Sequence, residues 1–471
     1  MVPEESAIME MDEIKDVRHL YMKVYEYMRD LIISGAYSFG EKVPSKRALA
    51  SLLHCSLNTV QSAYGQLVDE GYLIAEEKRG YFVADLEGIA AGMKQVEPIE
   101  VSQRRSVSFR YDFSYQGIDL NAFPVTVWRR LTREVLSDES LSFLESGNPK
   151  GEWDLRVSIA TYLRLSRGVQ CTPNQILIGS GTEYLLQLLI QLFDAETVYA
   201  IEDPGYEKLA LMFNRARVSY RPISVDESGL VPQSLADSDA DVVCITPSHQ
   251  FPTGSIMPVG RRVQLLSWAQ EKEGRYIIED DYDSEFRFAG KPIPSLQGLD
   301  QSGRVIYLGS FSKSLFPSLR ISYLVLPDQL ASRYDEVLSF TVCPVPLTEQ
   351  LTLAHFLSRG HFDRHLNRMR KLYKGKRDTL VAALKASFPG IRIEGASGGG
   401  HLLVQLDSQV PEEILVRRAA EAGVKVYALS RFFSTRTQRP RRSTLLFGYA
   451  SLSLQEIQDA VGLLKGVWSV L

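Results

Sequence analysis

A lysine directly after a strand-like run constrains this chain more than any other feature. Residues 305–308 (VIYL) form the apolar run, and Lys313 follows it between the small hydroxyl residues of the sequence GSFSKS. A lysine there can leave the end of a strand and point its amine into a cavity, where partial desolvation favours the neutral nucleophile of a Schiff base. The alternative is a surface lysine that follows a strand and has no such role. The neighbouring motifs must decide between these two interpretations of Lys313.

Acidic residues precede this lysine by about thirty positions. Asp280 and Asp281 end the strand-like run 276–279 (YIIE). Either aspartate can keep the pyridine nitrogen of pyridoxal 5′-phosphate (PLP) protonated, which makes the ring an electron sink. The pattern of lysine and aspartate therefore predicts a PLP site.

A glycine turn supplies the third element. Residues 179–183 (GSGTE) join an apolar stretch to a helical one. The turn places backbone N–H groups of Gly181 and Thr182 at a helix N-terminus, where a phosphate can bind. Such a turn is weak support alone, but it stands in the right order with the acids, Lys313 and Arg320.

These motifs resemble the fold-type I aminotransferases, from about residue 110 to the C-terminus. The resemblance implies an α/β body with a smaller C-terminal α+β domain, and alternating strand and helix patterns from 175 to 325 predict its mostly parallel sheet. It implies these cofactor contacts: Lys313 as the internal aldimine, Arg320 on the phosphate, Asp280 on the pyridine nitrogen, Tyr282 on the phenolic oxygen, Tyr206 over the ring, and Gly181, Thr182, Ser310 and Ser312 nearby.

One loop departs from the aminotransferase pattern. Residues 247–254 (PSHQFPTG) resemble the family's loop that ends in Pro-Thr-Gly. The family usually has Asn where this chain has Phe251, so its contact to the phenolic oxygen of the cofactor is lost. We expect His249 or Gln250 to replace that contact.

The first eighty-odd residues predict a different module. Residues 25–33 have helical apolar spacing, Ser45 is a plausible N-cap for a second helix, and residues 58–67 form a third. Two short strand-like runs at 71–74 and 80–83 follow. This layout resembles the GntR-type winged helix, whose Pro-Ser-x-Arg-x-Leu opening appears as PSKRAL. Helix-turn-helix and wing predict DNA binding.

The charge of this module is balanced. Residues 15–85 hold nine Lys and Arg against nine Asp and Glu, so a positive footprint must be local. The front of the third helix is expected to reach base edges. The predicted DNA-binding residues are Ser45, Lys46, Arg47, Asn58, Thr59, Gln61, Tyr64, Lys78, Arg79 and Gly80.

A winged helix joined to an aminotransferase-like body resembles the MocR subgroup of GntR regulators, with GabR-like proteins as the nearest pattern. The expected organisation is a DNA-binding domain at 15–85, a flexible linker at 86–108, and an effector body at 109–471. Within the body we expect a large domain to about 345 and a small one from about 385. The resemblance also implies a head-to-tail homodimer with exchanged DNA-binding domains.

The effector side of the body departs from plain aminotransferases. Leu446 occupies the place of the arginine that usually binds the substrate carboxylate. Arg431 matches the carboxylate-binding arginine of the GabR pattern, and Lys208 stands at its second arginine, offering a point charge instead of a planar fork.

Together these features predict a PLP-dependent transcription regulator. In it an amino acid or related amine forms an external aldimine and changes the affinity for operator DNA. A working aminotransferase with a DNA-binding domain, and a sensor of PLP alone, are the alternatives. We expect at most residual transaminase turnover.

The remaining features of the sequence set outer bounds. The four cysteines have no disulfide or zinc spacing, and no metal site is expected. His401, next to the glycines at 398–400, is expected to be structural. The start lacks a signal-sequence pattern, and no apolar run approaches the ~18 residues of a membrane span. We therefore expect a cytoplasmic protein without a membrane partner.

Overall fold

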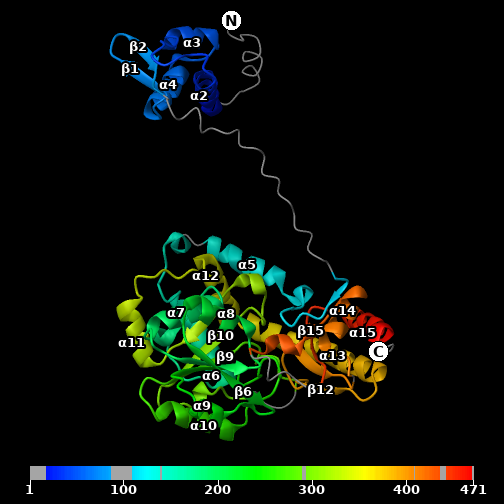
Figure 1. The fold of residues 1–471 in the computed structure, drawn as a ribbon. Coiled ribbons are helices and arrows are strands. Elements are labelled where there is room, and N and C mark those ends of the chain that lie inside the picture. Colours follow the sequence, from blue (N-terminus) through cyan, green and yellow to red (C-terminus); the bar gives the residue numbers. More distant parts are fainter. Residues whose placement is uncertain are drawn as a thin grey trace. The chain divides into compact units, whose positions relative to one another are not determined.

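The computed structural model describes residues 17–85, 109–137, 141–288, 293–407, 409–434 and 442–468. The chain divides into two compact units, Met1–Ser106 and Val107–Leu471 (Figure 1). Each unit has a hydrophobic core of its own. The predicted linker lies outside the described residues. In the described part of the chain, no helix is long and apolar enough to cross a membrane.

The first unit packs three helices against a β-hairpin. Its elements are α2 (Val17–Ile33), α3 (Lys46–Leu52), α4 (Leu57–Asp69), β1 (Leu73–Glu76) and β2 (Gly80–Val83). The Ser45 and Ser56 hydroxyls accept hydrogen bonds from the backbone N–H of Ala48 (3.2 Å) and Thr59 (3.1 Å) and so cap α3 and α4. β1 and β2 pair antiparallel around a tip at 77–79. The winged helix-turn-helix prediction is confirmed.

An eight-stranded sheet forms the centre of the second unit. In chain order its strands are β4 (Ile176–Gly179), β5 (Tyr199–Asp203), β6 (Tyr220–Asp226), β7 (Gly229–Leu230), β8 (Val242–Ile245), β9 (Tyr276–Asp281), β10 (Val305–Ser310) and β11 (Ser322–Val325). Their order in the sheet is β4-β11-β10-β9-β8-β5-β6-β7, with β7 and β11 antiparallel to their neighbours. β8 and β10 are buried along their whole length, as is typical of parallel strands covered on both faces. The mostly parallel sheet confirms the sequence prediction.

Helices follow most of these strands and bury apolar faces against the sheet. The helices of this part are α5 (Val125–Leu136), α6 (Trp153–Arg167), α7 (Thr182–Leu192), α8 (Glu207–Ala216), α9 (Pro232–Ala236), α10 (Val259–Gln270), α11 (Asp328–Val337) and α12 (Leu347–Ser358). Because the strands are parallel, the turns that lead from β4, β5, β8, β9 and β10 leave the sheet at one edge. That edge holds the predicted cofactor residues.

The C-terminal part contains a second, antiparallel sheet. Its strands are β12 (Arg392–Glu394), β13 (His401–Gln405), β15 (Tyr427–Ala428) and β16 (Thr444–Gly448), in the order β12-β13-β16-β15. α14 (Glu412–Glu421) and α15 (Leu454–Trp468) accompany it. β3 (Tyr111–Asp112), at the start of the body, pairs in parallel with β14 (Val424–Lys425). This pairing ties the start of the body to its C-terminal part.

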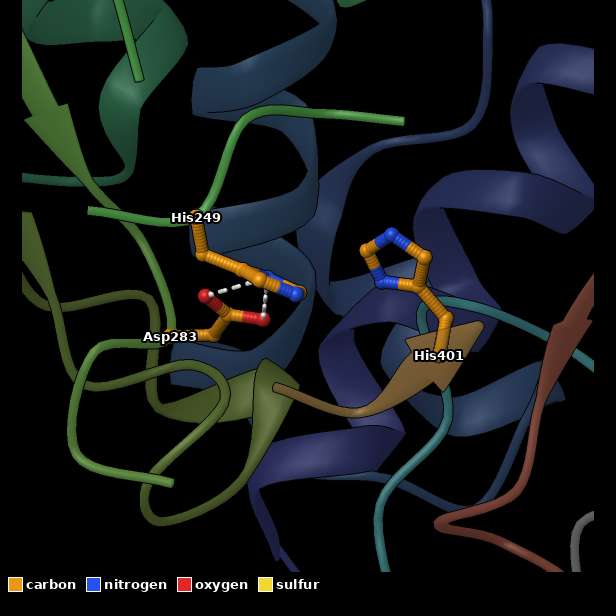
Figure 2. Close-up of side chains that lie close together, drawn as sticks. All are labelled: His249, Asp283 and His401. Carbon is orange, nitrogen blue, oxygen red and sulfur yellow. Dashed lines mark hydrogen bonds and ion pairs between the residues drawn. The ribbon is translucent and has the colours of Figure 1, made fainter. Parts of the chain in front are cut away.

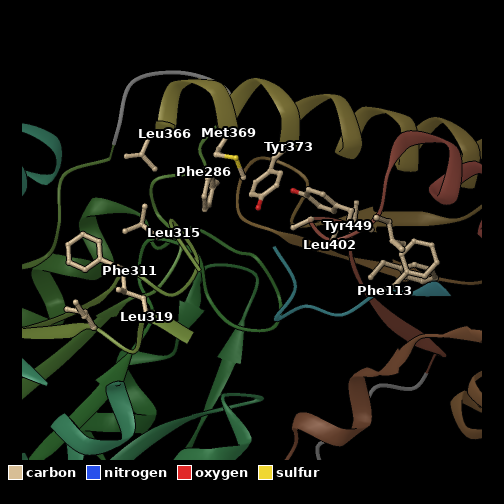
Figure 3. Packing of buried hydrophobic residues seen from close by; sticks show 14 of the residues in the cluster. Phe113, Phe286, Phe311, Leu315, Leu319, Leu366, Met369, Tyr373, Leu402 and Tyr449 are labelled. Carbon is tan, nitrogen blue, oxygen red and sulfur yellow. The ribbon is translucent and has the colours of Figure 1, made fainter. Parts of the chain in front are cut away.

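The long helix α13 (His361–Ser387) crosses between the two sheets. Leu366, Met369 and Tyr373 on α13 belong to one buried cluster (Figure 3). The same cluster contains Phe311 and Leu315 beside Lys313, together with Leu402 of the small sheet and Tyr449, which follows β16. One apolar core therefore joins the loop that carries Lys313 to the small sheet.

Candidate functional site

A cavity of about 200 Å³ lies at the edge of the large sheet where the parallel strands end. Of the predicted cofactor residues, Lys313, Asp280, Tyr282, Tyr206, Arg320, Thr182, Ser310 and Ser312 line it. The predicted effector residue Lys208 lines it too. The cavity also has lining residues that the sequence did not single out for the site: Tyr115, Gln116, Glu183, Thr246, Phe251 and Pro317.

The lysine at the centre of this cavity is poised as a nucleophile. Its ammonium donates a hydrogen bond to the backbone carbonyl of Tyr115. Burial lowers the pKa of Lys313 to about 8, although the charge of Asp283 opposes this effect. By that pKa about a tenth of the amine is neutral at pH 7, far more than for a solvated lysine.

The two aspartates that end β9 face opposite sides, because side chains alternate along a strand. Asp281 accepts a hydrogen bond from Arg167 Nε (2.7 Å) and another from the Tyr307 hydroxyl. Asp280 lines the cavity, and its buried Oδ1 has no hydrogen-bond partner among the described residues. Burial and neighbouring carboxylates raise the pKa of Asp280 to about 8. Asp280 is thus the carboxyl group that still needs a partner, as a pyridinium nitrogen would provide.

The opposite end of the cavity has the features of a phosphate seat. Gly181 precedes α7 with φ +97°, and a Cβ there would lie 2.2 Å from Arg320 Nη2, so a side chain would displace the guanidinium. Arg320 Nη2 donates to the Ser180 carbonyl and to Glu183 Oε2, each at 3.2 Å. Ser310 and Ser312 present hydroxyls joined at 3.0 Å. Helix N-terminus, guanidinium and hydroxyls together suit an anion.

Aromatic rings enclose the middle of the cavity. Tyr206 precedes α8, and its ring centroid lies 6.0 Å from that of Phe251. Phe251 is also 5.3 Å from Tyr115. Tyr115 comes from the segment after β3 and meets Lys313 across 198 positions of sequence. No local signal marks such a residue, whereas Phe251 stood out in the sequence as a departure from the loop pattern.

The structure places His249 outside the lining of this cavity. Its Nδ1 lies 3.0 Å from the Tyr282 hydroxyl and 3.0 Å from Asp283 Oδ2, behind the cavity wall. Gln250 does not line the cavity either, because its amide bonds the carbonyls of Pro204 and Phe251. Phe251 itself lines the cavity at this position of the loop.

The two predicted effector residues already have carboxylate partners. Lys208 Nζ donates to Glu183 Oε1 at 2.9 Å. Arg431 holds Glu207 through two hydrogen bonds of 2.8 and 2.9 Å, and it does not line the cavity. Its side chain is 54% exposed. The structure therefore does not bring Arg431 into the cavity with Lys208.

In the winged helix, some of the predicted DNA-binding residues are exposed and others are buried. The exposed residues are Ser45, Arg47, Asn58, Gln61, Lys78 and Arg79; Lys46 and Gly80 are half-buried. Lys78 has φ +61° at the tip of the wing. Two predictions need correction, because Thr59 is 7% exposed and bonds the Ser56 hydroxyl, while Tyr64 is fully buried and donates to the Pro44 carbonyl. Both side chains hold the fold together.

Comparison with known families matches both units. The chain matches the aminotransferase class I and II family over residues 115–462 and the bacterial regulatory proteins of the gntR family over residues 20–83. The multiple substrate aminotransferase of Thermococcus profundus shares the fold, with a TM-score of 0.69, 24% identity, and coverage of 81% of this chain and 96% of that one. Family and fold, with the lysine, free aspartate and anion seat described above, indicate PLP as the cofactor.

Relatives with both units cover nearly the whole chain. The HTH-type transcriptional regulator YdeL of Bacillus subtilis is 39% identical over 454 residues, which cover 96% of this chain and 97% of that protein. The probable rhizopine catabolism regulatory protein MocR of Rhizobium meliloti is 33% identical over 472 residues, 96% and 94% of the two chains. The chain therefore belongs to the MocR-type GntR regulators, in which a winged helix-turn-helix unit precedes an aminotransferase class I and II body.

Proposed function

We propose that this protein regulates transcription in response to an amine. Residues 17–85 bind operator DNA, and the body binds PLP and an amino-group effector at Lys313. The observation that carries the proposal is one cavity lined both by Lys313, whose pKa is lowered, and by Asp280, whose buried Oδ1 has no hydrogen-bond partner among the described residues, on a chain with a winged helix. Operator DNA lies in the cytoplasm, so the protein acts there.

Each residue of the site has a distinct task. PLP supplies a carbonyl carbon that amines attack and a ring that accepts electrons. Lys313 offers the neutral amine, Asp280 holds a proton at the pyridine nitrogen, and Arg320 with the N-terminus of α7 binds the phosphate. Tyr206 and Phe251 exclude water from the ring faces. An effector amine would use the same carbonyl chemistry that the cofactor offers to Lys313.

The loop that carries Lys313 is packed against the rest of the body. Phe311 and Leu315 flank the lysine and share a core with α13 and the small sheet. A shift of this loop therefore requires the core to repack, and packed cores change between discrete arrangements. We propose that the effector selects one of these arrangements and thereby changes DNA affinity.

We further propose a homodimer, with the DNA-binding units exchanged head to tail. Large apolar side chains of the body are exposed between residues 120 and 144 and in the segment before α12. They are Leu120, Val125, Leu136, Leu141, Leu144, Phe340 and Val342. Exposed apolar side chains in such number favour a protein partner. Residues 86–108 have an r.m.s. reach on the order of 25 Å, which permits exchange between subunits.

The test measures operator affinity by fluorescence anisotropy while amines and amino acids are added. An effector should change the affinity of wild-type protein and not that of Lys313→Ala. The aminotransferase alternative would be favoured by turnover of amino acid and 2-oxoacid at about 1 s⁻¹ or faster. An unchanged DNA affinity with every amine, while PLP alone alters it, would replace the proposal with a PLP sensor.

Variants of the winged helix test the DNA side separately. Arg47→Ala and Lys78→Ala should weaken binding on all sequences and reduce the salt dependence by about one unit of slope each, because such contacts are to phosphates. Neither variant should alter the absorbance of bound cofactor. Intact DNA binding at physiological salt would remove that residue from the interface.

A further inference from the structure

His249, Asp283 and His401 form a buried cluster behind the cofactor cavity (Figure 2). His249 and Asp283 follow β8 and β9, whereas His401 begins β13 in the small sheet. The ring centroids of the two histidines lie 5.1 Å apart. The proposed function assigns no task to this cluster. It touches the lining of the cavity at Tyr282, through His249, and at Phe251, whose ring centroid lies 5.5 Å from that of His401.

The hydrogen on His249 can be located from its partners. Nδ1 lies 3.0 and 3.2 Å from the two carboxylate oxygens of Asp283, which accept hydrogen bonds and do not donate them. Nδ1 therefore carries a hydrogen. Burial alone would lower the pKa of His249, but the charge of Asp283 and the hydrogen bond to it raise the pKa above its usual value. Both effects of Asp283 favour the form of His249 that carries a hydrogen on Nδ1.

The same nitrogen also fixes the role of Tyr282. The Tyr282 oxygen lies 3.0 Å from Nδ1, so it accepts from this nitrogen and shares its single hydrogen with Asp283. Burial and the nearby carboxylates of Asp283 and Asp280 raise the pKa of Tyr282 well above its usual value, so the phenol keeps its own hydrogen. That hydrogen must point away from Nδ1, and Tyr282 lines the cavity.

The chain packs tightly against His249 and Asp283. Gly399 has φ +70°, and a Cβ there would lie 2.2 Å from His249 Cε1 and 2.5 Å from Asp283 Oδ2. The Tyr449 hydroxyl donates to the Gly399 carbonyl at 2.6 Å and holds the glycine in position. A glycine at this position is required by the close approach. The pair is thus held in one geometry from both the large and the small sheet.

We propose that His249 and Asp283 are positioning residues that turn the Tyr282 hydroxyl into a donor aimed at an anionic oxygen of the ligand in the cavity. This inference rests on the proposed cofactor, whose phenolic oxygen is such an acceptor. It explains how the site works with Phe251 in the wall, where no amide side chain assists Tyr282. His249 then acts through Tyr282 and not by contact with the ligand.

A double-mutant cycle tests this inference. The proteins are wild type, Tyr282→Phe, His249→Leu and the double variant, and the measurement is the dissociation constant of PLP. Tyr282→Phe should weaken binding roughly tenfold, as expected for one buried hydrogen bond. His249→Leu should cause a similar loss in wild type and almost none in the Tyr282→Phe background. Equal losses in both backgrounds would overturn the proposal.

His401 supplies the matched control. It is buried in the same cluster, but its Nε2 lies 3.2 Å from the Pro252 carbonyl, and in the described part of the chain it makes no hydrogen bond with Tyr282. His401→Leu should therefore cost the same with and without the Tyr282 hydroxyl. His249→Asn, which keeps an N–H near the position of Nδ1, should restore most of the affinity lost in His249→Leu. Failure of this rescue counts against the proposal.

A measurement without cofactor separates this inference from the proposed function. Nitrogen NMR of cofactor-free wild-type protein should show His249 protonated at Nδ1. An unprotonated Nδ1 would overturn the inference even if PLP binds as proposed. A protonated Nδ1 in a protein that does not bind PLP would instead refute the proposed cofactor site. This experiment also decides the matter should His249→Leu fail to fold.

Discussion

The two ends of the ligand site differ in how their charged groups are satisfied. At the cofactor end, Asp280 is buried with an oxygen that lacks a partner in the described structure, and Lys313 has a lowered pKa. The two predicted effector residues, Lys208 and Arg431, are partly exposed, and each pairs with a carboxylate of its own chain. Unmet buried groups indicate a ligand with one fixed position. If Lys208 or Arg431 binds an effector carboxylate, that carboxylate must compete with Glu183 or Glu207.

Loss of the lysine should have the largest effect. Borohydride should fix the cofactor irreversibly to wild-type protein, and Lys313→Ala should lose both this product and the visible absorbance of the bound cofactor. Because the pKa of Lys313 is about 8, attachment in wild type should slow as the pH falls below 8, where the amine gains a proton. Mass spectrometry of the reduced protein locates the modified residue. A label on another lysine would contradict the assignment of Lys313 as the residue that binds the cofactor.

Asp280→Asn should separate cofactor binding from stability. Removal of the charged partner should weaken PLP binding roughly ten- to a hundredfold. The pKa of Asp280 is raised from 3.8 to about 8, so the folded cofactor-free protein holds a proton that the unfolded chain releases. Its stability therefore falls as the pH rises from about 4 to 8. Asp280→Asn should remove this loss and stabilise the cofactor-free protein by about 1–3 kcal/mol at pH 8.

Asp281→Asn is the control, for which we expect a change in stability of the opposite sign. Its carboxylate pairs with buried Arg167, so its removal should destabilise the protein by about 3–5 kcal/mol. Thermal unfolding of both variants without cofactor measures the two effects. Destabilisation by Asp280→Asn would mean that Asp280 has a structural partner after all.

Arg431→Gln probes the effector end. If Arg431 leaves Glu207 to bind an effector carboxylate, the variant should weaken effector binding, followed by absorbance, by about 1 kcal/mol, because the side chain is half exposed and exposed ion pairs contribute little. PLP binding should be unchanged. Arg221→Gln is the matched control, since Arg221 makes a similar two-bond pair with Asp239 outside the cavity lining. A full response in Arg431→Gln would assign the carboxylate to another residue.

Glu207→Gln should give the smallest effect and the opposite direction. It frees Arg431 from its internal partner, so an effector with a carboxylate should bind more tightly. Partly exposed ion pairs contribute at most about 1 kcal/mol, which limits the gain to roughly fivefold. Titration of the effector by absorbance measures it, with Asp239→Asn as control. Weaker binding would show that Glu207 contacts the effector directly.

The sequence predicted best where a motif and a strand end coincide. Lys313, Asp280 and Arg320 lie at one edge of the sheet because each follows or precedes a strand that apolar residues mark clearly. Tyr115 escaped prediction because a pairing between β3 and β14 brings it to the site. The carboxylates on Lys208 and Arg431 escaped for the same reason, since spacing does not show side-chain partners.

The DNA-binding unit gives a similar lesson on a smaller scale. Capping and wing signals predicted its elements correctly, because they depend on neighbours in the chain. Assignment of single DNA contacts was less successful. Thr59 and Tyr64 lie on the first turns of α4 beside exposed Asn58 and Gln61, but they face the core. Helical periodicity distinguishes such faces only when the packing partner is known.

The shared core under α13 has a consequence for how the body unfolds. Phe311 and Leu315 of the lysine loop, Tyr373 of α13 and Tyr449 beside the small sheet belong to one buried cluster. Residues that share a core lose their packing together, so heat should melt both sheets of the body in one cooperative transition. A ligand that binds at the lysine therefore raises the melting temperature of the small sheet as well, although that sheet lies outside the parallel scaffold.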